Sequence, residues 1–195
     1  SDGIGQAFTD SPDEFSGNIS QVLRIQLNNN KNRAIFVATL NAIMNYLGDT
    51  YATIHCKDDE PELCAEQIVN HIKCRYNPSK IGLIGFNPAI AEALVVNFLP
   101  ENVIITDLYS ENIGTEKFGV EIWDGNDRTE QAICDSDLVL LTGTTMVNGS
   151  FDEIFHYLSL YSPDYLIYGV TSAGICKLLN LPRICPYGKP KAPEI

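Results

Sequence analysis

The chain has 195 residues, and 45% of them are hydrophobic, which is enough for a buried core in one large domain or in a main domain with a smaller one. Its 25 acidic residues outnumber 13 basic ones, and the net charge of −12 argues against nucleic acid or an anionic membrane surface as a partner. No window approaches the ~18–20 apolar residues of a membrane span, and the six cysteines lack the spacing of a small disulfide framework. We therefore expect a cytoplasmic protein with reduced thiols.

The first residues are predicted to form a loop, because residues 2–16 are rich in Gly, Asp, Ser and Pro and show no apolar period. We call residues 2–16 the strap and expect the strap to face a ligand. Residues 19–27 alternate loosely, which leaves strand and helix open, and residues 28–30 are expected to form a turn. What precedes Ser1 is left open by the sequence.

A helix is predicted over residues 33–47, because apolar residues recur there at helical spacing and Gly48 supplies a stop. The expected buried face consists of Phe36, Leu40, Ile43, Met44 and Leu47. The helix should pack on an apolar surface.

A second helix is predicted to begin inside an acidic run. Asp59 is suited to cap free amides, Glu62 follows as in a capping box, and Pro61 is tolerated only in a first turn. Cys64, Ile68 and Ile72 then form the expected apolar stripe.

Beyond Asn77-Pro78, strands are predicted to alternate with helices. The expected strands cover residues 81–86, 103–108, 120–123, 138–142, 165–170 and 183–186, and the expected helices cover residues 88–98, 129–134, 151–161 and 173–179. Such alternation is typical of an α/β fold with a Rossmann-like, mainly parallel sheet and helices on both faces. We expect this domain to span residues 78–195, after an N-terminal segment of residues 1–77 that carries the strap and two helices.

In open α/β sheets the ligand lies beyond the carboxyl ends of the strands, and small hydroxyl residues and glycines in those loops allow backbone amides to approach an anion. This rule predicts a set of ligand-binding residues, although such residues also cap helices. They are Asn87, Asp107, Thr142, Gly143, Thr144, Thr145, Thr171 and Gly174.

A metal site is predicted in the ten residues from His55 to Cys64, which combine soft thiol and imidazole ligands with hard carboxylates. The predicted metal ligands are His55, Cys56, Asp58, Asp59, Glu60 and Cys64. This donor set suits several divalent or heavy-metal cations without selecting one. The alternative interpretation is a solvated acidic helix start with one core cysteine.

A dinucleotide cofactor is not expected, although Gly82, Gly85 and Asp107 have part of the required spacing. Phe86 occupies space that a pyrophosphate would need, and Pro88 removes an amide that would bind it.

Four groups of residues carry a resemblance to a known family: Ile81-Gly-Leu-Ile-Gly-Phe-Asn-Pro88, Asp107-Leu108, Asp137-Leu-Val-Leu-Leu-Thr-Gly-Thr-Thr145 with Val147-Asn148, and Tyr168-Gly-Val-Thr171. With them the chain resembles the putative heavy-metal chelation family (DUF364) of uncharacterised proteins. The resemblance implies a small domain like the enolase N-terminal domain, joined to a Rossmann-like domain, with a ligand site between them. We expect this chain to contain only a part of that small domain, and the run from His55 to Cys64 matches no family motif.

These observations support three hypotheses. The first is binding of a heavy metal or an anionic small molecule between the N-terminal segment and the Rossmann-like domain. The second is an enzyme acting on a nucleotide-linked or carboxylated substrate, and the third is a noncatalytic assembly module. The sequence leaves open whether the chain is an enzyme and whether it forms a homodimer.

Overall fold

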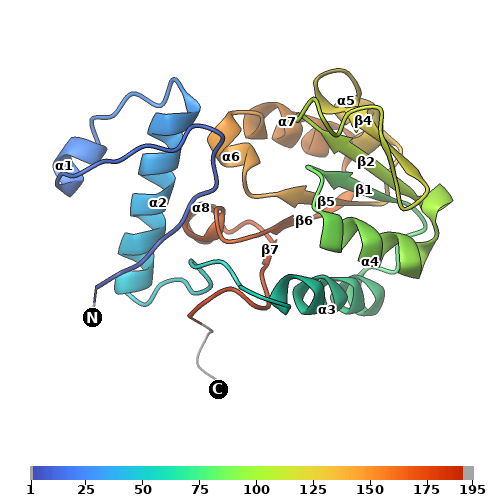
Figure 1. Cartoon of the computed structure of the whole chain (residues 1–195), viewed down its shortest axis with the longest axis horizontal. Coiled ribbons are helices and arrows are strands. Elements are labelled where there is room, and N and C mark those ends of the chain that lie inside the picture. Colours follow the sequence, from blue (N-terminus) through green and yellow to red (C-terminus); the bar gives the residue numbers. More distant parts are fainter. Residues whose placement is uncertain (1, 191–195) are drawn as a thin grey trace. The chain divides into compact units, whose positions relative to one another are not determined.

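A computed structural model describes residues 2–190 (Figure 1). The chain divides into two compact units. Unit 1 contains Ser1–Cys56, Thr142–Phe151 and Ile167–Ile195, and unit 2 contains Lys57–Leu141 and Asp152–Leu166. The predicted boundary near residue 77 stays a prediction, and each unit is considered by itself.

The sheet has seven strands in the order β3-β4-β2-β1-β5-β6-β7. The strands are β1 (Ile81–Ile84), β2 (Val103–Asp107), β3 (Glu116–Lys117), β4 (Val120–Asp124), β5 (Leu138–Thr142), β6 (Asp164–Tyr168) and β7 (Arg183–Ile184). β1 pairs in parallel with both β2 and β5, whereas β3 pairs antiparallel with β4. Without β3, the order equals the 3-2-1-4-5-6 order of doubly wound nucleotide-binding folds. The predicted α/β, Rossmann-like and mainly parallel fold is confirmed.

The core of unit 2 is built on continuous apolar strands. Each residue of β1 is buried, and so are the first four residues of β2. Such runs are expected where helices cover both faces of a parallel sheet. In Figure 1, α3 (Glu60–Arg75) and α4 (Pro88–Phe98) lie on one side of these strands, and α5 (Gly125–Cys134) and α7 (Phe151–Tyr161) on the other.

Unit 1 is built around α2 (Asn30–Tyr46), with the short helices α1 (Ile19–Val22), α6 (Thr145–Asn148) and α8 (Ala173–Leu179). The Asn29 side chain caps α2 by accepting from the Asn32 amide, and Gly48 follows the helix with φ +74°. A glycine is favoured there because other residues adopt a positive φ only at a cost.

The buried face of α2 differs from the predicted one. It consists of Ala34, Val37, Asn41 and Met44, whereas Leu47 is exposed. The apolar pattern misplaced the face because it treats an asparagine as a surface residue, and Asn41 is fully buried.

The start of α3 was predicted correctly, but the predicted capping box is absent. Asp59 is the N-cap residue, yet its side chain makes no capping hydrogen bond. Instead a Glu60 carboxylate oxygen accepts from the Lys57 amide at 2.9 Å. The preceding residue, Asp58, has a left-handed backbone with φ +55°.

In the part of the chain that the structure describes, no helix combines the length and the apolar content needed to cross a membrane. All six cysteines lie in that part and are present as thiols.

Candidate functional site

The strap runs along α2 in unit 1, without helix or strand, as predicted for residues 2–16. Gly3 and Gly5 permit this close approach, because a Cβ atom at either position would collide with the backbone of Ala42. The residues of the strap alternate between exposed and half-buried from Asp2 to Asp10, as expected for an extended chain on a surface.

The strap also forms hydrogen bonds with Thr53 and His55. The Gln6 amide donates to the Thr53 carbonyl at 2.9 Å, and the Thr53 hydroxyl donates to the Ile4 carbonyl at 2.6 Å. The Gln6 side-chain oxygen accepts from the His55 amide at 2.7 Å. The strap therefore fixes the backbone of the segment that carries His55.

Asn41 connects the strap to the loop that follows β6. Its side-chain amide donates to the carbonyl oxygens of Gln6, Val170 and Thr171 at 2.9, 3.2 and 3.1 Å. Its side-chain oxygen accepts from the Gly174 amide at 2.7 Å. Buried polar groups need such partners, so Asn41 fixes both segments against α2.

His55 and Cys56 bring an imidazole and a thiol close together. His55 Nδ1 lies 2.5 Å from the Cys56 carbonyl oxygen and 3.9 Å from Cys56 Sγ. An Nδ1 proton donated to the carbonyl leaves the Nε2 lone pair for a ligand, which is how metal-binding histidines are commonly oriented. The Phe8 ring packs edge-on against the imidazole, with centroids 5.1 Å apart.

The four other predicted metal ligands belong to unit 2, whereas His55 and Cys56 belong to unit 1. Asp58 and Asp59 are exposed, and the Glu60 carboxylate bonds to the Lys57 amide. Cys64 is half-buried on α3, whose buried stripe is Ala65, Ile68, Val69 and Ile72. Among residues 2–190, no group of three or more His, Cys, Asp or Glu side chains could hold a metal ion.

The predicted ligand loops after β5 and β6 come together within unit 1. A Cβ atom on Gly143 would lie 2.8 Å from the Ser172 backbone nitrogen, so glycine is what permits this approach. Thr144 donates its hydroxyl to the Thr142 hydroxyl at 3.1 Å, and Thr145 donates to the Thr142 carbonyl at 2.8 Å.

Thr171 and Gly174 face the strap and α2. The Thr171 hydroxyl accepts from the Phe8 amide at 3.1 Å, and the Gly174 amide donates to Asn41. Phe8 thus contacts Thr171 through its amide and His55 through its ring. The loop after β6 and the His55–Cys56 pair are therefore neighbours.

The remaining predicted ligand residues, Asn87 and Asp107, are in unit 2 and bond within their own loops. Asn87 caps α4 by accepting from the Ile90 amide at 3.1 Å. Asp107 accepts from the Leu108 amide at 2.8 Å and from the Asn112 side chain at 2.5 Å. Both side chains already have structural partners.

A comparison with protein families matches residues 71–176 to the DUF364 model, described as putative heavy-metal chelation. The match covers more than half of the chain. The chain belongs to the DUF364 family. The matched residues include all the predicted ligand loops but not His55 or Cys56, so the DUF364 match does not extend to the predicted metal cluster.

The fold of a solved DUF364 protein agrees with this assignment. A crystal structure of a DUF364 protein of unknown function from Pyrococcus horikoshii matches with a TM-score of 0.52 and 17% sequence identity. The alignment covers 86% of this chain and 59% of that one, so the chain spans about three fifths of its length. At this identity the likeness shows the fold alone. No protein with a curated description matched the chain.

Two arginines of unit 1, Arg33 and Arg183, hold backbone segments together and were not predicted from the sequence. The Arg33 guanidinium donates to the Val147 carbonyl at 2.6 Å and to the Asn148 carbonyl at 3.2 Å, which fixes α6 against α2. Arg183 donates to the carbonyls of Tyr51, Ala52 and Gly169. An isolated arginine carries no sequence signal that distinguishes a carbonyl clamp from a surface charge.

Two thiols lie in the electrostatic field of Arg183, and Cys176 is buried whereas Cys185 is half-buried. Burial raises the pKa of Cys176 to about 11 and also raises the pKa of Cys185, although the guanidinium opposes both changes. Burial likewise lowers the pKa of Arg183. Because a neutral thiol is a poor nucleophile and metal ligand, we expect Cys176 and Cys185 to be unreactive.

Proposed function

We propose that the chain binds a thiophilic metal cation in unit 1, with His55 and Cys56 as its first protein ligands. The observation that carries the proposal is that the Cys56 thiol lies beside the His55 ring, 3.9 Å from Nδ1, while the Cys56 carbonyl engages Nδ1 and leaves Nε2 as the nitrogen that would bind the cation. Thiolate and imidazole together suit soft and borderline cations. The net charge of −12 also favours cation binding over anion binding.

The donor set fits such a cation in part. One imidazole nitrogen and one thiolate provide two ligands, and tetrahedral sites need four. The remaining positions are then available to water or to a small anionic molecule. We expect the hydroxyl of Thr171, which neighbours His55 through Phe8, to orient such a molecule, together with the hydroxyls of Thr142 and Thr144 in the loop after β5. In this arrangement a metal cation and an anionic small molecule would bind at the same site, which combines the two ligands of the first hypothesis.

The acidic residues Asp58, Asp59 and Glu60 are not ligands in this proposal. They belong to unit 2, whereas His55 and Cys56 belong to unit 1, and the Glu60 carboxylate bonds to the Lys57 amide. The description of the DUF364 family agrees with metal binding. Since the family match begins at residue 71, the choice of His55 and Cys56 rests on the contacts of this chain.

The test is a cadmium titration of tag-free, anaerobically purified protein, followed by the thiolate-to-cadmium absorption band. We expect Cys56→Ser to lose one bound equivalent and His55→Ala to weaken that equivalent. Cys74→Ser, which removes an exposed thiol, is the matched control and should retain it. Equal stoichiometry and affinity in the wild type and Cys56→Ser would refute the proposal.

An enzyme acting on a nucleotide-linked or carboxylated substrate is the second candidate, and the strand order of the sheet favours it. In this candidate the hydroxyls of Thr144, Thr145 and Thr171, all in unit 1, orient the substrate. A thermal-shift screen separates the two functions, because a ligand that binds the folded state raises the melting temperature. Stabilisation by nucleotides but not by cadmium would favour the enzyme.

A further inference from the structure

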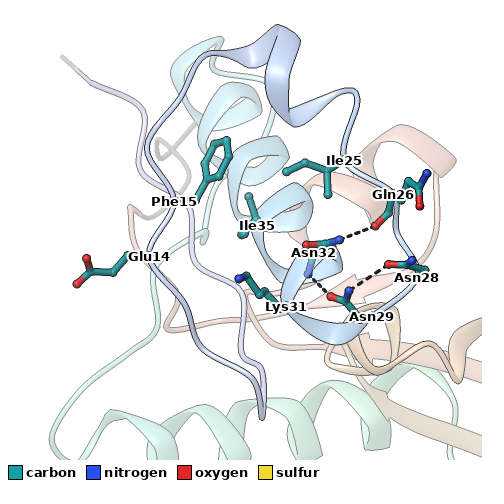
Figure 2. A pocket seen from close by; sticks show the side chains of 9 residues that line it. All are labelled: Glu14, Phe15, Ile25, Gln26, Asn28, Asn29, Lys31, Asn32 and Ile35. Atoms are coloured by element: carbon teal, nitrogen blue, oxygen red, sulfur yellow. Dashed lines mark hydrogen bonds between the residues drawn. The ribbon is translucent and has the colours of Figure 1, made fainter.

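An open surface cavity of about 490 Å³ lies in unit 1 between the strap and the beginning of α2 (Figure 2). Its volume falls within the ~300–1,000 Å³ typical of small-molecule sites. The lining comes from the strap, from the segment between α1 and α2, and from the first turns of α2. None of the residues assigned to the metal site contributes to the lining.

The cavity has an apolar side and an amide side. Figure 2 shows the side chains of Phe15, Ile25 and Ile35 gathered together, with the amides of Gln26 and Asn32 beyond them. Phe15 is 43% exposed, so a large part of its ring is available to a ligand. Sites for apolar ligands have few polar groups. A lining with both apolar side chains and amides therefore indicates a ligand that has an apolar face and hydrogen-bonding groups.

Some of the amide groups hold the cavity wall in place. The side-chain oxygen of Asn29 accepts from the backbone amide of Asn32 at 2.9 Å. The side-chain nitrogen of Asn29 donates to the side-chain oxygen of Asn28 at 3.0 Å. Asn32 donates to the Gln26 carbonyl at 2.8 Å. These bonds fix the orientation of the amides before a ligand arrives, which lowers the entropic cost of binding.

Other polar atoms of the same side chains remain available. Within residues 2–190, the side-chain amide of Gln26, the side-chain nitrogen of Asn28 and the side-chain oxygen of Asn32 make no hydrogen bond to the protein. Together they offer donors and acceptors side by side, since each amide carries both. A hydroxyl group also donates and accepts, so a row of hydroxyls matches such a wall.

The charges around the cavity disfavour an ionic ligand. Lys31, the cation of the lining, forms an ion pair with Asp13. The Asp10 carboxylate accepts from the Asn30 side chain at 2.9 Å, and the Glu14 side chain points away from the cavity in Figure 2. An anion would find no unpaired cation in the lining, and a second cation would face the ammonium of Lys31.

We infer that this cavity binds a neutral, polyhydroxylated ligand of the sugar class. The apolar C–H face of a sugar ring would pack on Phe15, and its hydroxyls would bond to Gln26, Asn28 and Asn32. The inference is independent of the proposed metal site.

The test is a two-dimensional amide NMR titration of the full chain with maltose, glucose 6-phosphate and spermidine as neutral, anionic and cationic probes. We expect maltose to shift the resonances of Phe15, Asn28 and Asn32 in a saturable manner. Phe15→Ala should weaken maltose binding about tenfold, because the sugar then loses the apolar contact with the aromatic ring. Phe118→Ala is the matched control, since Phe118 is 40% exposed and lies in unit 2.

Gln26→Ala is a second variant that leaves the fold intact, because its side chain has no protein partner in the described chain. It should weaken maltose binding by a smaller factor than Phe15→Ala. The inference is overturned if maltose causes no saturable shift at these residues, or if only a charged probe does. It is also overturned if the Phe118 and Phe15 variants lose the same affinity.

Discussion

The sheet-end loops of the two units are held in different ways. In unit 2, Asn87 and Asp107 bond to residues within five positions of themselves. In unit 1, the loop after β6 is held by Phe8 and Asn41, which are at least 129 residues away in sequence. The unit 2 loops are therefore set by local capping, whereas the unit 1 loop depends on long-range contacts with the strap and α2.

Asn41→Ala should have the largest effect, because it breaks the long-range contacts of unit 1. It leaves the Gly174 amide and the Thr171 carbonyl without their buried partner, while the Val170 carbonyl keeps only the Ala173 amide, at an expected cost of about 3–5 kcal/mol. Urea unfolding followed by circular dichroism measures the loss, and hydrogen exchange should accelerate in residues 169–176. Asn45→Ala, which removes an acceptor for the Ile4 amide, is the control and should cost less than about 1 kcal/mol.

A rise in pH should weaken unit 1 through the buried thiol of Cys176. Well below pH 9 the Cys176 thiol is protonated in both the folded and the unfolded chain. Between the ordinary pKa of 9.0 and the folded value of about 11, only the unfolded chain loses the proton, so stability falls as pH rises. The expected loss reaches about 2–3 kcal/mol.

Urea midpoints at pH 8 and pH 10.5 measure this effect. Cys176→Ala should show a smaller decrease between the two pH values than the wild type, whatever its stability at pH 8. Cys134→Ala changes an exposed thiol of unit 2 and should keep the decrease of the wild type. A Cys176→Ala variant with an unchanged decrease would contradict the prediction.

Asn87→Ala should have the smallest effect and should stay within unit 2. Loss of the α4 cap is expected to cost about 1 kcal/mol. Fluorescence of Trp123, the single tryptophan, reports this change because Trp123 lies in unit 2. Hydrogen exchange in residues 171–174 should not change, and faster exchange there would show that the two kinds of loop are not independent.

The fold was largely predictable because its main elements carry local signals. The helices at residues 88–98, 151–161 and 173–179 and the strand at residues 138–142 have the predicted bounds. Pro88 fixes the start of the first helix, and buried apolar runs define the strand. The strand β3 and the helix α6 were missed, because two and four residues are too few to show a period.

The candidate site was less predictable because its contacts are long-range. The loops at Thr142–Thr145 and Thr171 were nominated by the position rule for parallel sheets, and the structure brings both into unit 1. Asn41 could not be identified, since a polar residue in a helix gives the same signal whether it is buried or exposed. The run from His55 to Cys64 looked continuous in sequence, yet its residues fall in two units.

The two edges of the sheet, β3 and β7, have only two residues each. An edge strand exposes unpaired backbone groups, and long edges allow other chains to add strands and to aggregate. Here a neighbouring molecule would find too short a ladder at either edge to extend the sheet. Any self-association of this chain is therefore expected to use side-chain surfaces rather than strand addition.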